Sequence, residues 1–106
     1  MRDINECRFT GFVGQPPIKF TKDGATIVKF HLACKNTFID SSGNERERVT
    51  WVQGVCFNKV AESFAANVDG GNHIEIRGEQ VTRTIYRDDF EYQKAEINTR
   101  WFKVNG

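Results

Sequence analysis

Hydrophobic and polar residues alternate over much of the chain, and a period of two is typical of half-buried β-strands. Residues 26–35 alternate most regularly, with Phe30 and Leu32 on one face and His31 on the other. Residues 7–13 also begin as a strand, but glycines then interrupt the alternation and indicate a bend or a bulge. Further strands are predicted at residues 49–57, at residues 73–81 with their continuation 81–86, and at residues 92–104.

Turn residues separate these strands. The prolines at 16 and 17 end the first strand, and residues 22–24 (Lys-Asp-Gly) are a turn signal before the second. Residues 41–48 predict an exposed hairpin loop. Residues 87–89 (Arg-Asp-Asp) predict the tip of a second hairpin, between the last two strands.

The period changes between residues 59 and 68, where apolar side chains recur every three or four positions. These side chains are Val60, Ala61, Phe64, Ala65 and Val68. The spacing predicts a short amphipathic helix, and the glycines at 70 and 71 end it.

The element order and the bend in the first strand predict an all-β fold with one short helix. Five strands with the helix between strands 3 and 4 fit a small closed barrel better than an open sandwich. The expected architecture is the five-stranded Greek-key barrel of the oligonucleotide/oligosaccharide-binding (OB) fold. The sequence has no internal repeat or linker, so residues 1–106 are expected to form a single OB-fold domain.

Composition narrows the cellular setting. The chain has 106 residues, of which 39% are apolar and 27% charged, so a soluble and somewhat polar domain is expected. It contains neither an apolar run of ~18 residues nor a signal-peptide pattern, which argues against a membrane or secreted protein. Cys7, Cys34 and Cys56 are widely spaced, which suggests neither a disulfide framework nor a zinc site. A reducing, cytoplasmic location is therefore expected.

Catalytic chemistry has little support in the sequence. His31 and His73 lie on different predicted strands without the spacing of a zinc site, and the chain lacks a phosphate-binding P-loop motif. Asp88, Asp89 and Glu91 cluster at a hairpin tip, where a solvated turn is a simpler interpretation than a divalent-ion site. We therefore expect no enzyme activity, no catalytic residue, no metal and no cofactor.

The distribution of charge is more informative than the net charge of +1. Basic residues are concentrated between positions 17 and 60, and acidic residues between 61 and 80, so folding can separate a basic face from an acidic one. The candidate phosphate contacts are Lys22, Lys29, Lys35, Arg46, Arg48, Lys59, Arg83 and Arg87.

Aromatic residues are interleaved with these basic residues on the predicted strands and hairpins. Four of them are candidates for stacking on unpaired bases: Phe38, Trp51, Phe57 and Tyr86. Single-stranded nucleic acid is bound in this way, with cations along the phosphates and rings against the bases. The alternative is that aromatic residues serve the core, as the pattern indicates for Phe30 and Phe64 and allows for Trp101. Trp51 and Phe57 share their face with apolar Val55, so a bulge or a half-buried face must reconcile them.

From Asn5 to Val104 the chain resembles the bacterial-type single-stranded DNA-binding proteins. The matching residues, in order and at nearly constant spacing, are Asn5, 9–17 (Phe-Thr-Gly-Phe-Val-Gly-Gln-Pro-Pro), 30–33, 51–52, Phe57, 59–62, Gly71, 76–79 and 82–83. The resemblance implies an OB barrel that binds single-stranded DNA without sequence preference in replication, recombination or repair, in the bacterial cytoplasm. It places base-stacking aromatics at Phe38, Trp51 and Phe57. It places a fourth at Ile85 or, after a one-residue shift, at Tyr86, which we favour.

The resemblance also implies a homo-oligomer, with a tetramer favoured and a dimer possible. Val52 stands where the family has a polar residue near a subunit contact, and Asn58 replaces a family glycine. The chain ends at Gly106 without the family's acidic C-terminal tail, which recruits partner proteins. A trimmed protein, or a short phage or mobile-element form, would account for this ending.

Two other functions fit the same pattern. One is a primosomal-type dimeric OB protein that binds single-stranded DNA and contacts a helicase. The other is an OB-fold protein-interaction module without nucleic-acid binding. The aromatic set at Phe38, Trp51 and Phe57 favours the DNA-coating protein over the first, and the pairs of cationic and aromatic residues on the predicted binding strands argue against the second.

Overall fold

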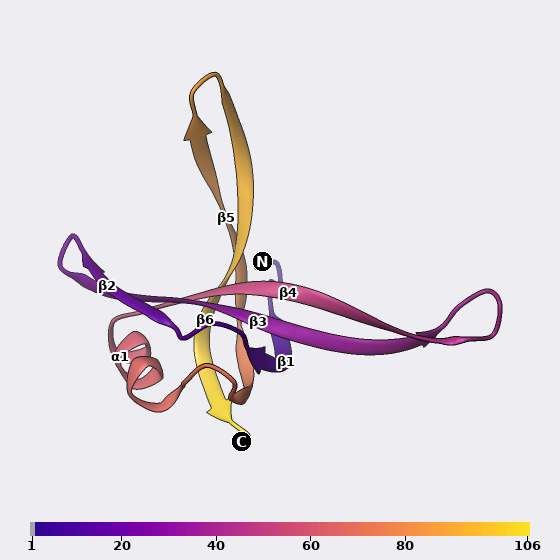
Figure 1. The fold of residues 1–106 in the computed structure, drawn as a ribbon. Coiled ribbons are helices and arrows are strands. Elements are labelled where there is room, and N and C mark those ends of the chain that lie inside the picture. Colours follow the sequence, from indigo (N-terminus) through magenta and orange to yellow (C-terminus); the bar gives the residue numbers. More distant parts are fainter. Residues whose placement is uncertain (1) are drawn as a thin grey trace.

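A computed structural model describes residues 2–106. Over these residues the elements are β1 (Cys7–Val13), β2 (Ile18–Lys22), β3 (Ala25–Ile39), β4 (Glu45–Phe57), α1 (Asn58–Asn67), β5 (His73–Arg87) and β6 (Phe90–Val104) (Figure 1). The single helix within residues 2–106, α1, has 10 residues, which is too short to span a membrane.

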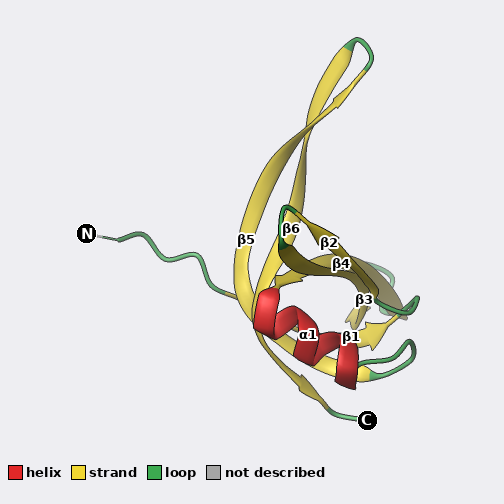
Figure 2. Cartoon of the chain, turned by 90° about the vertical axis from the view of Figure 1, so that its left-hand side faces the viewer, coloured by secondary structure: helices red, strands yellow, loops and turns green. Residues whose placement is uncertain are grey.

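Five of these strands close a barrel. The pairings run from β1 to β5, β6, β4 and β3, and β3 pairs back with β1 through Phe12↔Ala33 and Val13↔Leu32. The β4–β6 pairing is parallel and the others are antiparallel, so the barrel is mixed. Helix α1 connects β4 to β5, the third and fourth barrel strands, and packs against the barrel (Figure 2). The predicted five-stranded OB-like barrel and the position of its helix are confirmed.

The core follows the alternation that the sequence predicted. Phe30 of β3 stacks on Phe64 of α1 with ring centroids 4.4 Å apart, and Phe102 of β6 meets Phe64 edge-on at 5.0 Å. The Phe30 ring also lies directly over Gly54 on the neighbouring strand, where a Cβ atom would overlap it. A glycine is therefore required at this position for the helix and the sheet to share one aromatic cluster.

Three strand boundaries differ from the prediction. Residues 18–22, for which no strand was predicted, form β2 and pair with the start of β3. Strand β3 continues to Ile39, and residues 45–48, predicted as loop, belong to β4. Most of these side chains are exposed. They therefore show little of the contrast between a buried and an exposed face from which a strand is predicted.

Two long hairpins project from the barrel in different directions, and part of the unpredicted strand length lies in the first of them (Figure 1). We call residues 35–49 the β3–β4 ribbon and residues 81–96 the β5–β6 ribbon. The first turns around Asp40, whose carboxylate accepts hydrogen bonds from the backbone N–H groups of Ser42 and Asn44, both at 2.9 Å. The second turns at Asp88 and Asp89, between register partners Arg87 and Phe90.

Candidate nucleic-acid interface

The exposed aromatic residues of β4 lie on the outer face of the β3–β4 sheet. This outer face consists of Ile27, Lys29, His31, Ala33 and Lys35 of β3, with Val49, Trp51, Gln53, Val55 and Phe57 of β4 in register with them. Trp51 is 58% exposed and Phe57 is 42% exposed, whereas Val55 between them is 3% exposed. The face is therefore half-buried, and the register of β3 and β4 runs without a shift. Of the two explanations offered for the Trp51–Val55–Phe57 pattern, the half-buried face is confirmed.

Gly14, in the chain that follows β1, packs against the ring of Trp51. A Cβ atom at Gly14 would lie 2.9 Å from Cζ3 of the indole, so a larger residue there would displace the outer end of the ring. One part of the ring is therefore fixed against the backbone, and the rest remains accessible. A ring held in this way needs little ordering before a base stacks on it.

A groove runs beside Phe57, between the outer face and the base of the β5–β6 ribbon. Its cavity of about 200 Å³ is lined by Phe20, Lys22, Ile27, Lys29, Val55, Phe57, Arg83 and Glu96. The floor is apolar, because Ile27 and Val55 are buried. Of the sequence-predicted cations, the groove brings together Lys22, Lys29 and Arg83 with the Phe57 ring.

Three cations and one carboxylate, Glu96, set the electrostatics of the groove. Burial lowers the pKa of Lys29, and the nearby charges of Arg83, Lys94 and Lys22 lower it further, while Glu96 acts in the opposite direction. The Glu96 carboxylate is buried and accepts a hydrogen bond from Arg83 Nε at 2.6 Å. Positive charges gathered over an apolar floor suit a ligand that carries phosphates beside flat bases.

Phe38, Arg46 and Arg48 lie on the other face of the β3–β4 ribbon. Phe38 and Arg46 are register partners, and their even positions place them on the opposite side of the sheet from Trp51 and Lys35. The Arg48 guanidinium lies 4.8 Å from the centroid of the Phe38 ring. Arg46 Nε is bonded to the Asp40 carboxylate at 2.9 Å, and this contact lowers the pKa of Asp40. The candidate set is therefore divided between two faces of one ribbon.

The remaining candidates lie around these features. Lys35 Nζ is 5.9 Å from the centroid of the Phe12 ring, and Lys59 is exposed in the first turn of α1, next to Phe57. Arg87 is exposed at the tip of the β5–β6 ribbon. Tyr86 is exposed beside it, but it points to the opposite face of that ribbon from Arg83 and Arg87.

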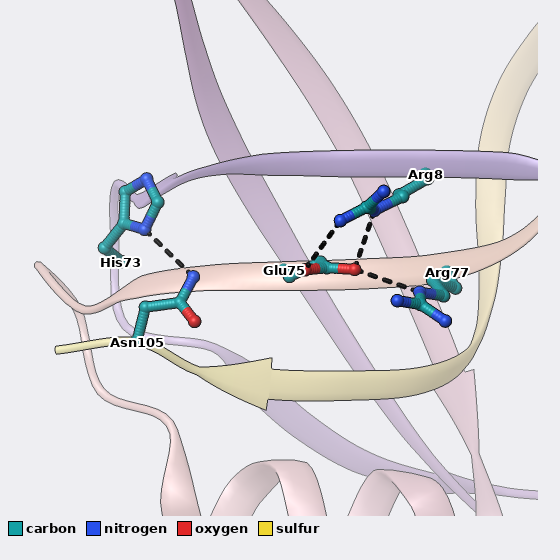
Figure 3. A network of polar contacts seen from close by, with 5 residues as sticks. All are labelled: Arg8, His73, Glu75, Arg77 and Asn105. Atoms are coloured by element: carbon teal, nitrogen blue, oxygen red, sulfur yellow. Dashed lines mark hydrogen bonds and ion pairs between the residues drawn. The ribbon is translucent and has the colours of Figure 1, made fainter.

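A second polar cluster lies on β1 and β5, and no pattern in the sequence predicted it (Figure 3). The buried carboxylate of Glu75 accepts hydrogen bonds from Arg8 Nε at 2.8 Å and Arg77 Nε at 2.9 Å. Both hydrogen bonds lower the pKa of the Glu75 carboxyl, and the bond from Arg8 has the larger effect. Arg77 also covers Trp101, with its guanidinium 4.4 Å from the ring centroid. Trp101 is therefore a partly exposed surface residue rather than a core residue.

Burial bears on one further residue that the sequence analysis singled out. Val52, which the resemblance placed near a subunit contact, is buried and packs in the barrel core. It is therefore unavailable as a surface contact. Across residues 2–106, no three His, Cys, Asp or Glu side chains are grouped so that they could hold a metal ion.

A closed five-stranded barrel with aromatic and basic side chains on its outer face defines an OB-fold binding protein. The profile of the single-strand binding protein family matches residues 4–104. The chain belongs to this family, which confirms the family resemblance and the expectation of a non-enzymatic binding protein.

Curated relatives agree with this assignment. The chain is 33% identical over 84 residues to single-stranded DNA-binding protein 1 of Chlorobaculum tepidum, an alignment that covers 78% of this chain and 52% of that protein. It is 34% identical over 91 residues to protein 2 of the same organism, covering 84% and 62%. The chain thus spans about half to three-fifths of the length of these relatives.

Among solved structures, the fold is similar to a deletion mutant of the Thermus aquaticus single-stranded DNA-binding protein. The TM-score is 0.87 at 20% identity, covering 97% of this chain and 51% of that one. It is also similar to the Plasmodium falciparum protein in complex with single-stranded DNA, with a TM-score of 0.84 at 18% identity and coverage of 98% and 95%. At these identities the likeness supports the fold alone.

Proposed function

We propose that this chain binds single-stranded DNA without sequence preference and protects it in replication, recombination or repair. Unpaired bases stack on Trp51 and Phe57, while Lys29 and Lys35 on the neighbouring strand contact phosphates. The other proposed contacts are Phe38, Tyr86, Lys22, Arg46, Arg48, Lys59, Arg83 and Arg87. Membership of the family supports this function, as do the names of the curated relatives, which describe single-stranded DNA-binding proteins from bacteria. We place the activity in the cytoplasm of a bacterial cell, whether host, phage or mobile-element encoded.

One observation carries the proposal: two large rings on one strand are exposed although the residue between them is buried. Trp51 is 58% exposed and Phe57 42%, on either side of Val55. Folding normally buries rings of this size. Every base offers a flat π-face, so rings that stay exposed beside lysines bind unpaired bases regardless of sequence.

A fluorescence titration tests the proposal. Poly(dT) is expected to quench the emission of Trp51 strongly, and a duplex of equal length is expected to bind far more weakly. The chain also contains Trp101, on a different surface beneath Arg77. Trp51→Phe should therefore remove most of the quenching, and Trp101→Phe should leave it in place. Equal affinity for duplex and single-stranded DNA would contradict the proposal.

We also propose a dimer-based assembly, with a tetramer favoured, whose interface includes β1. Phe12 is about half exposed on the outward side of this strand, in edge-on contact with His73 at 4.8 Å. Among the strand pairings of residues 2–106, Cys7–Gly11 pair with β5 alone, so one edge of this segment is open to a second strand. Joining several sites raises affinity through effective concentration, and closed symmetry is the usual way to join them. Analytical ultracentrifugation checks this, and a single species near the chain mass of 12.2 kDa would refute it.

A further inference from the structure

Phe12 is a large exposed ring that the proposed DNA contacts leave out. It lies near the end of β1 and is 46% exposed, whereas its chain neighbours Gly11 and Val13 are buried. Phe12 is the register partner of Ala33 on β3 and also of His73 on β5. The ring therefore lies at the seam where β1 closes the barrel between these two strands.

The register places Phe12 and Trp51 on the same face of the sheet. Residues directly opposite each other in an antiparallel pair project to the same side. Ala33 is opposite Phe12 on one neighbouring strand and opposite Trp51 on the other. The two rings therefore flank Ala33 on the outer face, with Cα atoms about two strand spacings, or ~10 Å, apart. Ala33 has only a methyl group and is nearly buried, so it does not separate the rings.

Two glycines bring β1 and the chain after it close to this part of the outer face. A Cβ atom at Gly11 would overlap the carbonyl oxygen of Ala33, so the glycine lets β1 approach the backbone of β3. Gly14 packs against the indole of Trp51. Phe12 lies between the two glycines, and its position beside Trp51 follows from both contacts.

The surroundings of Phe12 suit a stacked nucleotide. His73 meets the ring edge-on with centroids 4.8 Å apart, and the side-chain amide of Asn105 lies 3.2 Å from His73 Nδ1 (Figure 3). Contacts of this kind orient the ring before a ligand arrives, which lowers the cost of binding. Lys35 Nζ lies 5.9 Å from the centroid of the ring on its other side along the sheet, on β3. A base on Phe12 would therefore have a cation near its phosphate.

We propose that Phe12 is a base-stacking residue, which extends the stacking surface of Trp51 across the seam between β3 and β1. This proposal rests on the proposed function and adds a contact on the barrel itself, away from both ribbons. The competing role for Phe12 is a subunit contact. The open edge proposed for assembly consists of Cys7–Gly11, whereas Phe12 is paired with a strand on each side. Its backbone is therefore closed to a further strand.

An indole placed at position 12 reports directly on this surface. The test variant combines Phe12→Trp with Trp51→Phe and Trp101→Phe, so that its emission comes from position 12 alone. Poly(dT) is expected to quench this emission strongly, because a base stacks on the indole. The matched control is Trp51→Phe alone, in which the remaining indole is Trp101 beneath Arg77, outside the proposed path. The emission of the control should change little.

Loss of the ring measures its contribution to affinity. Phe12→Leu keeps an apolar side chain but removes the flat face, and it is expected to weaken binding at least about fivefold. The ligand is a dye-labelled oligo(dT) of about 12 nucleotides, which one OB fold can cover, so its affinity does not depend on joined subunits. Binding is followed by fluorescence anisotropy. Trp101→Leu removes a ring of similar exposure, 41% against 46%, and should leave the affinity unchanged.

Sedimentation of the same variants separates stacking from assembly. Phe12→Leu is expected to sediment as the unmodified chain does. A smaller species that loses affinity for long strands and keeps it for the short strand would show that Phe12 serves assembly, and would overturn this proposal. Unquenched emission from position 12 would also overturn it, while quenching of Trp51 in the unmodified chain would still uphold the proposed function. Failure of the unmodified chain to bind oligo(dT) would overturn the proposed function itself.

Discussion

The Glu96 carboxylate offsets part of the positive charge in the groove, and removing its charge is expected to strengthen DNA binding. The carboxylate accepts the Arg83 Nε hydrogen bond at 2.6 Å and opposes the cations around Lys29. Glu96→Gln keeps the shape and an acceptor oxygen for Arg83 while it frees the guanidinium charge for a phosphate. The Arg83 side chain is half exposed, so losing this ion pair should change the free energy of unfolding by only about 0–1 kcal/mol.

The size of the gain follows from counterion release. One additional phosphate contact on a single strand changes the slope of log affinity against log salt by about −0.7, which corresponds to roughly fivefold tighter binding at about 0.1 M salt. Fluorescence titrations with oligo(dT) at four or five salt concentrations measure both quantities. Glu79→Gln is a matched control, because Glu79 pairs with Arg100 at the same distance of 2.6 Å and lies outside the groove. Unchanged or weaker binding by Glu96→Gln, with the control unchanged, would show that phosphates do not enter the groove at Arg83.

Three further outcomes are expected. Trp51→Ala should weaken binding of single-stranded DNA by roughly 5- to 150-fold in a fluorescence-anisotropy titration, the equivalent of about 1–3 kcal/mol for one stacked base; a change below twofold would argue against stacking there. Gly54→Ala should lower the free energy of unfolding in urea by about 1–3 kcal/mol, because the added methyl group overlaps the Phe30 ring. Burial raises the pKa of the Cys56 thiol to about 12, so at pH 8 it should react with a thiol reagent only after unfolding, whereas half-buried Cys34 should react sooner; rapid labelling of Cys56 in the folded chain would contradict its position in the core.

The barrel could be predicted because its strands have one buried and one exposed face. In residues 26–35 that contrast marks Phe30 and Leu32 as core, and the spacing around Phe64 marks the helix. The residues of β2 and the start of β4 are largely exposed, so their strand structure depends on backbone pairing rather than on a hydrophobic pattern. These segments pair with their neighbours across short turns, and with both faces of the hairpin exposed such pairing leaves no hydrophobic period in the sequence.

The sequence indicated which residues are candidates for the site, but not on which face of a sheet or ribbon each of them lies. The pattern left Trp51 and Phe57 open between the core and the surface, and the structure exposes both. The sides on which Tyr86 and Tyr92 lie depend on the two-residue turn at Asp88 and Asp89, which fixes the register of the whole ribbon. A turn longer by one residue would have placed Tyr92 beside Tyr86. Likewise, the sequence does not show that Arg46 pairs with Asp40 or that Arg83 pairs with Glu96, because folding brings these side chains together.

The two projecting ribbons give the molecule regions of very different local stability. The barrel amides are protected by a shared aromatic core, whereas most side chains of the β3–β4 and β5–β6 ribbons are exposed. Segments with few buried contacts open without global unfolding, so their amides exchange with solvent while those of the barrel stay protected. A bound strand that bridges such a ribbon and the barrel would restrict this opening. Hydrogen exchange on the ribbons would then slow on binding with no change in the barrel, and part of the binding enthalpy would reflect ordered backbone rather than contacts to DNA.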